Sequence, residues 1–200
     1  MWNKIQRIYV ESNQVRPPSY YEYSYDFRNK STTSLTNDWW SFPKWTDGVA
    51  FDSNGMYKSS SWWRCGIYPI DVNGATKITV QANRYNIQTD VDMNAWIWQW
   101  INSNGNVINA NQIYRGYNLT NLYVAGTQKY NWGSVTWSYS TSMVLDIANT
   151  TATFNVWSSI NQTYTLSASD ITSILACTYL NCAVCKSGNH LKDISITINY

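Results

Sequence analysis

Hydrophobic and polar residues alternate along several short stretches of the chain, and this alternation predicts β-strands. Between Tyr21 and Phe27 an aromatic residue stands at every second position, so a strand there would place four rings on one face. Between Ile194 and Tyr200 the same period of two continues to the last residue. Residues 77–82 form a β-branched run directly after an Asn-Gly turn, which also predicts a strand.

The remaining pattern is all-β as well. Residues 95–101 are apolar at nearly every position, as in a strand buried on both faces, and residues 143–147 and 151–157 alternate on either side of a polar turn. Helix is expected only at 31–38, where Leu35 is the one apolar anchor. Short strands about ten residues apart predict an antiparallel, jelly-roll-like β-sandwich of two packed sheets. Their order in the sheets does not follow from spacing.

Composition narrows the class of protein. Of the 200 residues 13% are charged and 16% are aromatic, with 12 Trp and 16 Tyr, and the net charge is +2. Low charge argues against a disordered tail or a coiled coil, and the small net charge argues against a nucleic-acid partner. No apolar run reaches eighteen residues, so a membrane partner is not expected either.

The first residues are expected to form a separate unit. Pro17 and Pro18 favour a stiff, extended connector, and the stretch before them combines basic residues with isolated Ile and Val. We therefore predict an N-terminal attachment arm over 1–19 and a β-sandwich domain over 20–200. Residues 1–10 have charges and no small-residue cleavage site, so no secretory signal peptide is predicted.

Catalytic residues are scarce. His190 is the only histidine, and Glu11 and Glu22 are the only glutamates, so the chain offers few acid–base groups. No Gly-rich phosphate loop and no zinc-protease motif occur. We predict that the protein is not an enzyme. A depolymerase acting through two aspartates is the enzymatic alternative.

The cysteines allow two interpretations. Three thiols and an imidazole within fourteen residues could complete a tetrahedral zinc site; they are Cys177, Cys182, Cys185 and His190. Equally, the thiols could be small buried residues beside an exposed loop histidine. The second interpretation is favoured, and no cofactor is predicted.

The tryptophans are the best candidates for a binding surface. Those of the strand 95–101 are expected in the core. In a Trp doublet on a strand, one ring must point away from the core, where it could stack on a sugar or lie in a subunit interface. The candidate ligand or interface aromatics are Trp39, Trp40, Trp62, Trp63 and Trp132.

The N-terminal arm resembles the start of bacteriophage virion proteins of the head-fibre or tail-fibre type, from phages of gut bacteria. The resemblance rests on Lys4-Ile-Gln-Arg-Ile-Tyr-Val10, on Val15-Arg-Pro17 and on Tyr25-Asp-Phe-Arg28, and covers about thirty residues. It implies that a short segment attaches to the phage particle while a β-domain projects outward. The residues implied in virion attachment are Lys4, Ile5, Arg7, Ile8, Tyr9, Val10, Val15, Arg16 and Pro17.

Two functions are therefore in competition. The first is a non-enzymatic virion structural protein, a head- or tail-fibre subunit located in the virion, with other virion proteins as partners and a dimeric or trimeric state. The alternative is a carbohydrate-binding module or lectin that uses exposed tryptophans to bind a host surface glycan.

Overall fold

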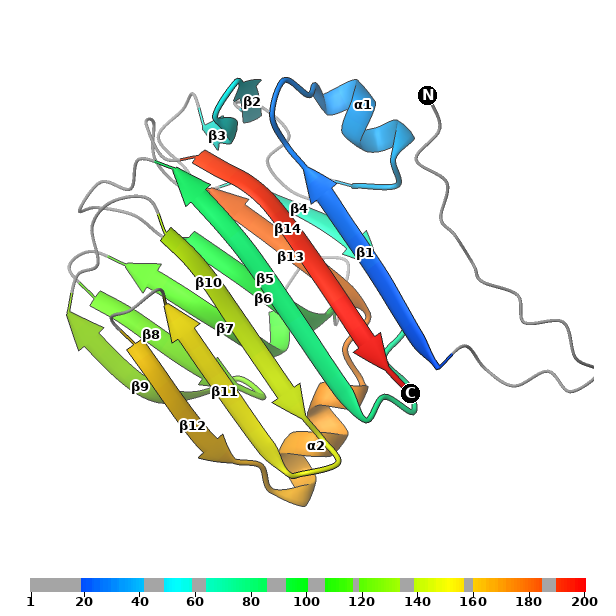
Figure 1. Ribbon diagram of the computed structural model, residues 1–200, viewed down its shortest axis with the longest axis vertical. Coiled ribbons are helices and arrows are strands. Elements are labelled where there is room, and N and C mark those ends of the chain that lie inside the picture. Colours follow the sequence, from blue (N-terminus) through cyan, green and yellow to red (C-terminus); the bar gives the residue numbers. More distant parts are fainter. Residues whose placement is uncertain are drawn as a thin grey trace, which may run out of the picture.

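Two antiparallel β-sheets pack face to face in the computed structural model of the protein (Figure 1). The structure describes residues 19–41, 49–58, 64–85, 93–100, 107–116, 119–133, 139–156, 160–184 and 190–200. The predicted antiparallel, jelly-roll-like β-sandwich is confirmed. The predicted division at residue 19 stays a prediction: the first strand begins at Tyr20, and the arm lies outside the described residues.

The larger sheet has eight strands in the order β12-β11-β10-β5-β14-β3-β2, and β1 also pairs with β14. Its strands are β1 (Tyr20–Asp26), β2 (Val49–Asp52), β3 (Gly55–Lys58), β5 (Lys77–Tyr85), β10 (Tyr139–Asp146), β11 (Thr151–Val156), β12 (Ile160–Thr165) and β14 (His190–Asn199). The predicted alternation over 194–200 thus belongs to a central strand, flanked by β5 on one side and by β1 and β3 on the other.

The smaller sheet has six strands in the order β4-β13-β6-β7-β8-β9. Its strands are β4 (Arg64–Pro69), β6 (Met93–Trp100), β7 (Val107–Gly116), β8 (Leu119–Val124), β9 (Thr127–Gly133) and β13 (Tyr179–Val184). Neighbours in this sheet come from distant parts of the chain, since β13 pairs with both β4 and β6.

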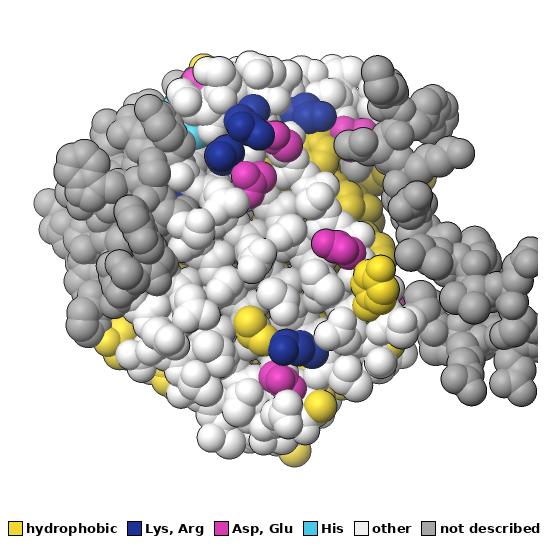
Figure 2. Space-filling view, viewed as in Figure 1, with side chains coloured by type: hydrophobic (Ala, Val, Ile, Leu, Met, Phe, Trp, Pro, Cys, Tyr) yellow, Lys and Arg dark blue, Asp and Glu magenta, His cyan; other side chains and the backbone are white. Residues whose placement is uncertain are grey.

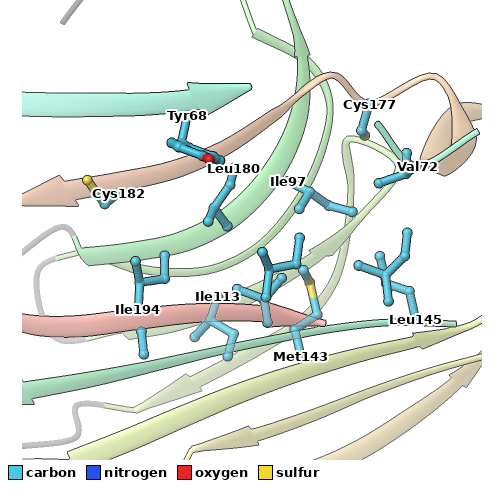
Figure 3. Packing of buried hydrophobic residues seen from close by; sticks show 14 of the residues in the cluster. Tyr68, Val72, Ile97, Ile113, Met143, Leu145, Cys177, Leu180, Cys182 and Ile194 are labelled. Atoms are coloured by element: carbon cyan, nitrogen blue, oxygen red, sulfur yellow. The ribbon is translucent and has the colours of Figure 1, made fainter. Parts of the chain in front are cut away.

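The core lies between the sheets because each strand turns every second side chain inward. On the larger sheet, Ile194, Met143 and Leu145 are buried, and they face Ile97 and Leu180 of the smaller sheet (Figure 3). Apolar side chains thus meet across the sandwich, and their burial is the main favourable term for folding.

The outer face of the larger sheet is polar and carries little charge. Figure 2 looks onto this face: most of its surface is white, charged side chains occupy a few places, and hydrophobic side chains gather along the flank by β1. The exposed positions of β5 and β12 are uncharged residues: Gln81, Asn161, Thr163 and Thr165. The low charge of the composition is therefore visible on this surface.

Two helices occur in the described chain. The first, α1 (Thr32–Asn37), has Ser31 as its N-cap and a fully buried Leu35, which confirms the expected helical turn and its anchor. The second, α2 (Ala168–Leu175), corrects the expectation that helix is confined to 31–38. Ser167 and Asp170 form a reciprocal capping box at its start, and this Ser-x-x-Asp spacing was its sequence signature.

Candidate functional site

The Trp39-Trp40 doublet follows α1 and does not lie on a strand. The N–H of Trp40 donates to Leu35 O at 3.0 Å and the N–H of Trp39 donates to Thr36 O at 3.2 Å, which is the pattern of a Schellman motif. This motif needs a left-handed residue after the helix, and Trp39 takes that position with φ +70°. Trp39 is therefore 72% exposed, whereas Trp40 is 1% exposed.

Trp40 is part of an aromatic cluster that closes the sandwich between its two sheet edges, β1 and β4. Its Nε1 donates to the Tyr23 hydroxyl at 2.9 Å, and the Tyr23 ring stacks on Tyr68 with centroids 4.0 Å apart. The Tyr25 hydroxyl donates to Asp38 Oδ2 at 2.7 Å. The prediction that Trp40 is a ligand or interface aromatic is therefore wrong, because its ring is buried in this cluster. Of the doublet, Trp39 is the ring that points outward.

Because of this cluster, the stability of the folded protein should fall at alkaline pH. Burial raises the pKa of Tyr21, Tyr23 and Tyr25 above the ordinary value of 10, so the unfolded chain loses these protons at lower pH than the folded chain. Their stabilisation is present below pH 10 and is lost as the pH rises from 10 toward the folded-state pKa values. We expect the urea concentration at the midpoint of unfolding to stay constant from about pH 7 to pH 9 and to fall above about pH 10.

Tyr21→Phe should reduce this alkaline loss, because it removes one of the perturbed phenols. The measurement is urea unfolding at a series of pH values, together with the ultraviolet absorbance of tyrosinate in the folded protein. A native chain whose three phenols ionise near pH 10 without losing stability would contradict the assignment.

The other candidate tryptophans lie where the structure describes no side chain. Trp132 belongs to β9, but its side chain is outside the described part, and Trp62 and Trp63 lie outside it altogether. Trp96 and its neighbours in β6 have a described backbone only, apart from the buried Ile97. The nine residues implied in virion attachment also lie outside the described ranges, so all these assignments stay predictions.

The described cysteines and histidine have other contacts. Cys177 lies in the core, where its Sγ accepts from Asn111 Nδ2 at 3.5 Å, and burial raises its pKa to about 12. Figure 3 shows Cys182, on β13, well separated from Cys177. His190 is 7% exposed, and its Nε2 lies 2.9 Å from Asp52 Oδ2.

These positions bear on the zinc hypothesis. Within the described residues, no group of three His, Cys, Asp or Glu side chains could hold a metal ion, and Cys185 lies outside them. His190 is buried beside Asp52, not exposed in a loop as the favoured interpretation supposed. The other half of that interpretation, that the thiols are buried, holds for Cys177 and Cys182.

A continuous row of residues crosses the whole smaller sheet on its outer face. Directly paired Cα partners follow one another from β4 to β9; in sheet order they are Ile67, Asn181, Trp96, Gln112, Tyr123 and Gln128. Their chain neighbours, including Tyr68, Leu180, Ile113 and Leu122, belong to the core. The described side chains of the row, those other than Trp96, therefore project away from the core. We call these six residues the amide row.

Exposure changes along the amide row. Asn181 is fully buried and Gln112 is 8% exposed, while Tyr123 is half-buried and Gln128 is exposed. The row therefore opens to solvent at its β9 end. Five steps between strands, each about 4.8 Å, make it about 24 Å long.

The described side chains of the amide row form hydrogen bonds only between uncharged groups. The Tyr123 hydroxyl donates to Gln128 Oε1 at 3.3 Å, Gln128 Nε2 lies 3.5 Å from Asn121 Oδ1, and Asn181 Nδ2 donates to Gly66 O at 3.1 Å. The buried Oε1 of Gln112 has no hydrogen-bond partner in the described structure. An unpaired buried acceptor costs about 1–3 kcal/mol of stability.

Chemically, the amide row suits an uncharged ligand rich in hydroxyl groups. Side-chain amides donate and accept at once, as hydroxyl groups do, and aromatic rings offer an apolar face. Sequence reasoning missed this site because each amide reads only as the polar half of an alternating strand. The site arises when the register of six strands brings the amides together.

No protein-family model and no curated protein matches the sequence. Solved structures share its fold at low identity. Lectin I-B4 from Griffonia simplicifolia aligns with a TM-score of 0.60 at 6% identity, over 90% of this chain and 99% of that one. The endo-1,3-β-glucanase from Streptomyces sioyaensis gives 0.57 at 13% identity, over 94% and 99%.

A phage protein also has this fold. The CBM2 module of the evolved Dit protein of Lactobacillus casei BL23 phage J-1 aligns with a TM-score of 0.52 at 13% identity, over 94% of this chain and 93% of that module. No described helix is long and apolar enough to cross a membrane. The chain thus has a β-sandwich fold that is also found in lectins, in a glucanase and in a phage carbohydrate-binding module.

Proposed function

We propose that the β-sandwich binds neutral carbohydrate along the amide row. The observation that carries this proposal is the exposed end of the row, where the Tyr123 ring and the Gln128 amide are accessible and hydrogen-bond to each other without any charge. A sugar ring would stack on Tyr123 and exchange hydrogen bonds with the Gln128 amide. Gln112 would support these residues from the neighbouring strand.

The composition of the amide row supports binding without hydrolysis. Glycoside hydrolysis ordinarily needs two carboxyl groups on either side of the scissile bond, and none of the six positions carries one. A row without charge also favours neutral over acidic polysaccharides, because no cation is present to pair with a uronate or sulfate. We therefore propose a lectin-like module, which is the alternative function inferred from the sequence.

The test uses the full chain and two matched Gln→Met variants. Gln128→Met removes the exposed amide while keeping the length of the side chain, and Gln81→Met makes the same change on the exposed outer face of the larger sheet. We expect Gln128→Met to weaken binding to an oligosaccharide about tenfold, and Gln81→Met to leave it unchanged. Glycan arrays identify the sugar, with β-1,3-glucan and N-acetylgalactosamine among the neutral probes, and calorimetry gives the affinity.

Stability separates a binding defect from misfolding. Gln128→Met should change the free energy of unfolding by no more than about 0.5 kcal/mol, because the side chain is exposed. The proposal fails if the native chain binds only acidic glycans or none, or if Gln128→Met binds as tightly as Gln81→Met.

We also propose that this module is displayed on a phage particle. The shared fold of the phage Dit module supports this second role, as does the resemblance of the N-terminal arm to virion proteins. In that role the arm would attach to the head or tail and the β-sandwich would face the host surface. Immunogold labelling of intact virions with an antibody to the β-sandwich tests it: surface labelling is expected, and particles that lack the protein would exclude it.

A further inference from the structure

Strand β1 leaves one edge of the larger sheet open. Phe27 donates its N–H to Lys192 O at 2.9 Å, and Tyr200 donates its N–H to Ser19 O at 3.2 Å. Odd-numbered residues of β1 therefore direct their backbone groups toward β14. Even-numbered residues direct theirs to the other side, where none of the described strands pairs with β1.

This open edge has only part of the usual protection against strand pairing. Proteins guard edges with proline, charged residues, bulges or very short strands; β1 has seven residues without Pro or Lys, pairs with β14 without a bulge, and carries two charges, Glu22 and Asp26. In the described part of the chain, the exposed large hydrophobic residues are Tyr20 and Trp39, at 48% and 72%. Both belong to this flank of the molecule, where Figure 1 shows β1 and α1 at the margin of the sheet.

We propose that β1 pairs with β1 of a second copy, antiparallel and about a two-fold axis at Tyr23, which makes the protein a dimer. A second β-strand pairs with such a row of backbone N–H and C=O groups by strand addition. With a two-fold axis, the same strand edge of each copy forms one half of the interface, as in a closed symmetric dimer. The two larger sheets then become one continuous sheet.

Charge selects the register of this pairing. With Tyr23 facing Tyr23 of the second copy, all seven residues pair, Glu22 faces Ser24, and Asp26 faces Tyr20. A shift of one step toward the N-terminus makes Glu22 face Glu22 of the other copy, and a shift the other way makes Glu22 face Asp26. Directly opposed like charges are destabilising, so the symmetric register is favoured.

The exposed aromatics flank the proposed interface on its two faces. Trp39 lies beside the C-terminal half of β1, on the side of Tyr23 and Tyr25, because Asp38 accepts from the Tyr25 hydroxyl and Trp40 donates to the Tyr23 hydroxyl. Tyr20 belongs to the opposite face. Antiparallel pairing brings Tyr20 of the second copy opposite Asp26, so its ring covers that face of the joined strands.

Two opposite substitutions at one exposed position test the interface and its register. Ser24→Lys places a lysine opposite Glu22 of the second copy, and Ser24→Glu places a carboxylate there. We expect the dimer dissociation constant to fall about threefold to tenfold for Ser24→Lys and to rise by a similar factor for Ser24→Glu. Light scattering and analytical ultracentrifugation over a range of concentrations give these constants for the full chain.

Two controls define the outcome. Thr163→Lys and Thr163→Glu make the same changes on β12, at the opposite edge of the sheet, and should leave the dissociation constant unchanged. A monomer at all concentrations, weakening by both Ser24 substitutions, or a response to Thr163 in place of Ser24 would each overturn the proposal.

Discussion

Replacing Trp40 with alanine is expected to destabilise the β-sandwich by about 3–5 kcal/mol. Trp40 is 1% exposed and its ring lies 5.4 Å from Phe27 and 5.6 Å from Tyr68, measured between centroids. The substitution leaves a cavity in the cluster that joins β1 to β4. It also removes the donor that pairs with the Tyr23 hydroxyl.

The neighbouring residue provides a matched control for this prediction. Trp39→Ala should change stability by no more than about 0.5 kcal/mol, because the ring is mostly exposed. Trp39→Gly should raise stability by up to about 1 kcal/mol, since glycine takes the left-handed conformation without strain. Urea unfolding measures all three variants. Equal losses for Trp39→Ala and Trp40→Ala would refute the division of the doublet into an exposed and a buried ring.

Replacing Gly55 with alanine is the second large effect, again about 3–5 kcal/mol. Gly55 begins β3 with φ +126°, a conformation that side chains with a Cβ rarely adopt. An added Cβ would overlap the backbone of β14, lying 2.7 Å from Leu191 C and 2.9 Å from Lys192 Cα. Since backbone atoms cannot rotate away, β3 would have to separate from the central strand.

Gly74→Ala separates the steric part of this effect from the conformational part. Gly74 also has a positive φ, +78°, but an added Cβ there would meet no atom within 4 Å. We expect a loss of about 1–2 kcal/mol at Gly74, from backbone strain alone. Thermal unfolding of both variants measures the difference, and a loss at Gly74 as large as at Gly55 would contradict the close approach of β3 to β14.

Local periodicity was sufficient to predict the fold class. The alternation at 21–27 and 194–200 became β1 and the central β14, and Leu35 became the buried anchor of α1. What periodicity could not predict is the conformation of Trp39, because a helix normally ends with glycine where this chain has tryptophan. The sequence pattern therefore places the doublet on a strand and does not predict that Trp40 is buried.

The amide row was beyond sequence reasoning for a different reason. Asn181 is far along the chain from Gln112 and Gln128, and it joins them only through the register of β13 with β6 and of β6 with β7. Register between distant strands depends on non-local pairing, which a single sequence does not display. The sequence instead drew attention to the tryptophans, of which Trp39 alone is described as exposed.

The pairing of β1 with β14 also determines how the domain would resist mechanical force applied through its N-terminal end. Seven consecutive residues of β1 pair with β14, and Ser19 accepts the N–H of Tyr200 at the start of this ladder. Tension along the strand would load all of these hydrogen bonds in parallel, whereas tension across the sheet would break them one after another from Tyr20. A domain pulled in line with β1 would therefore hold against much larger forces than one pulled sideways.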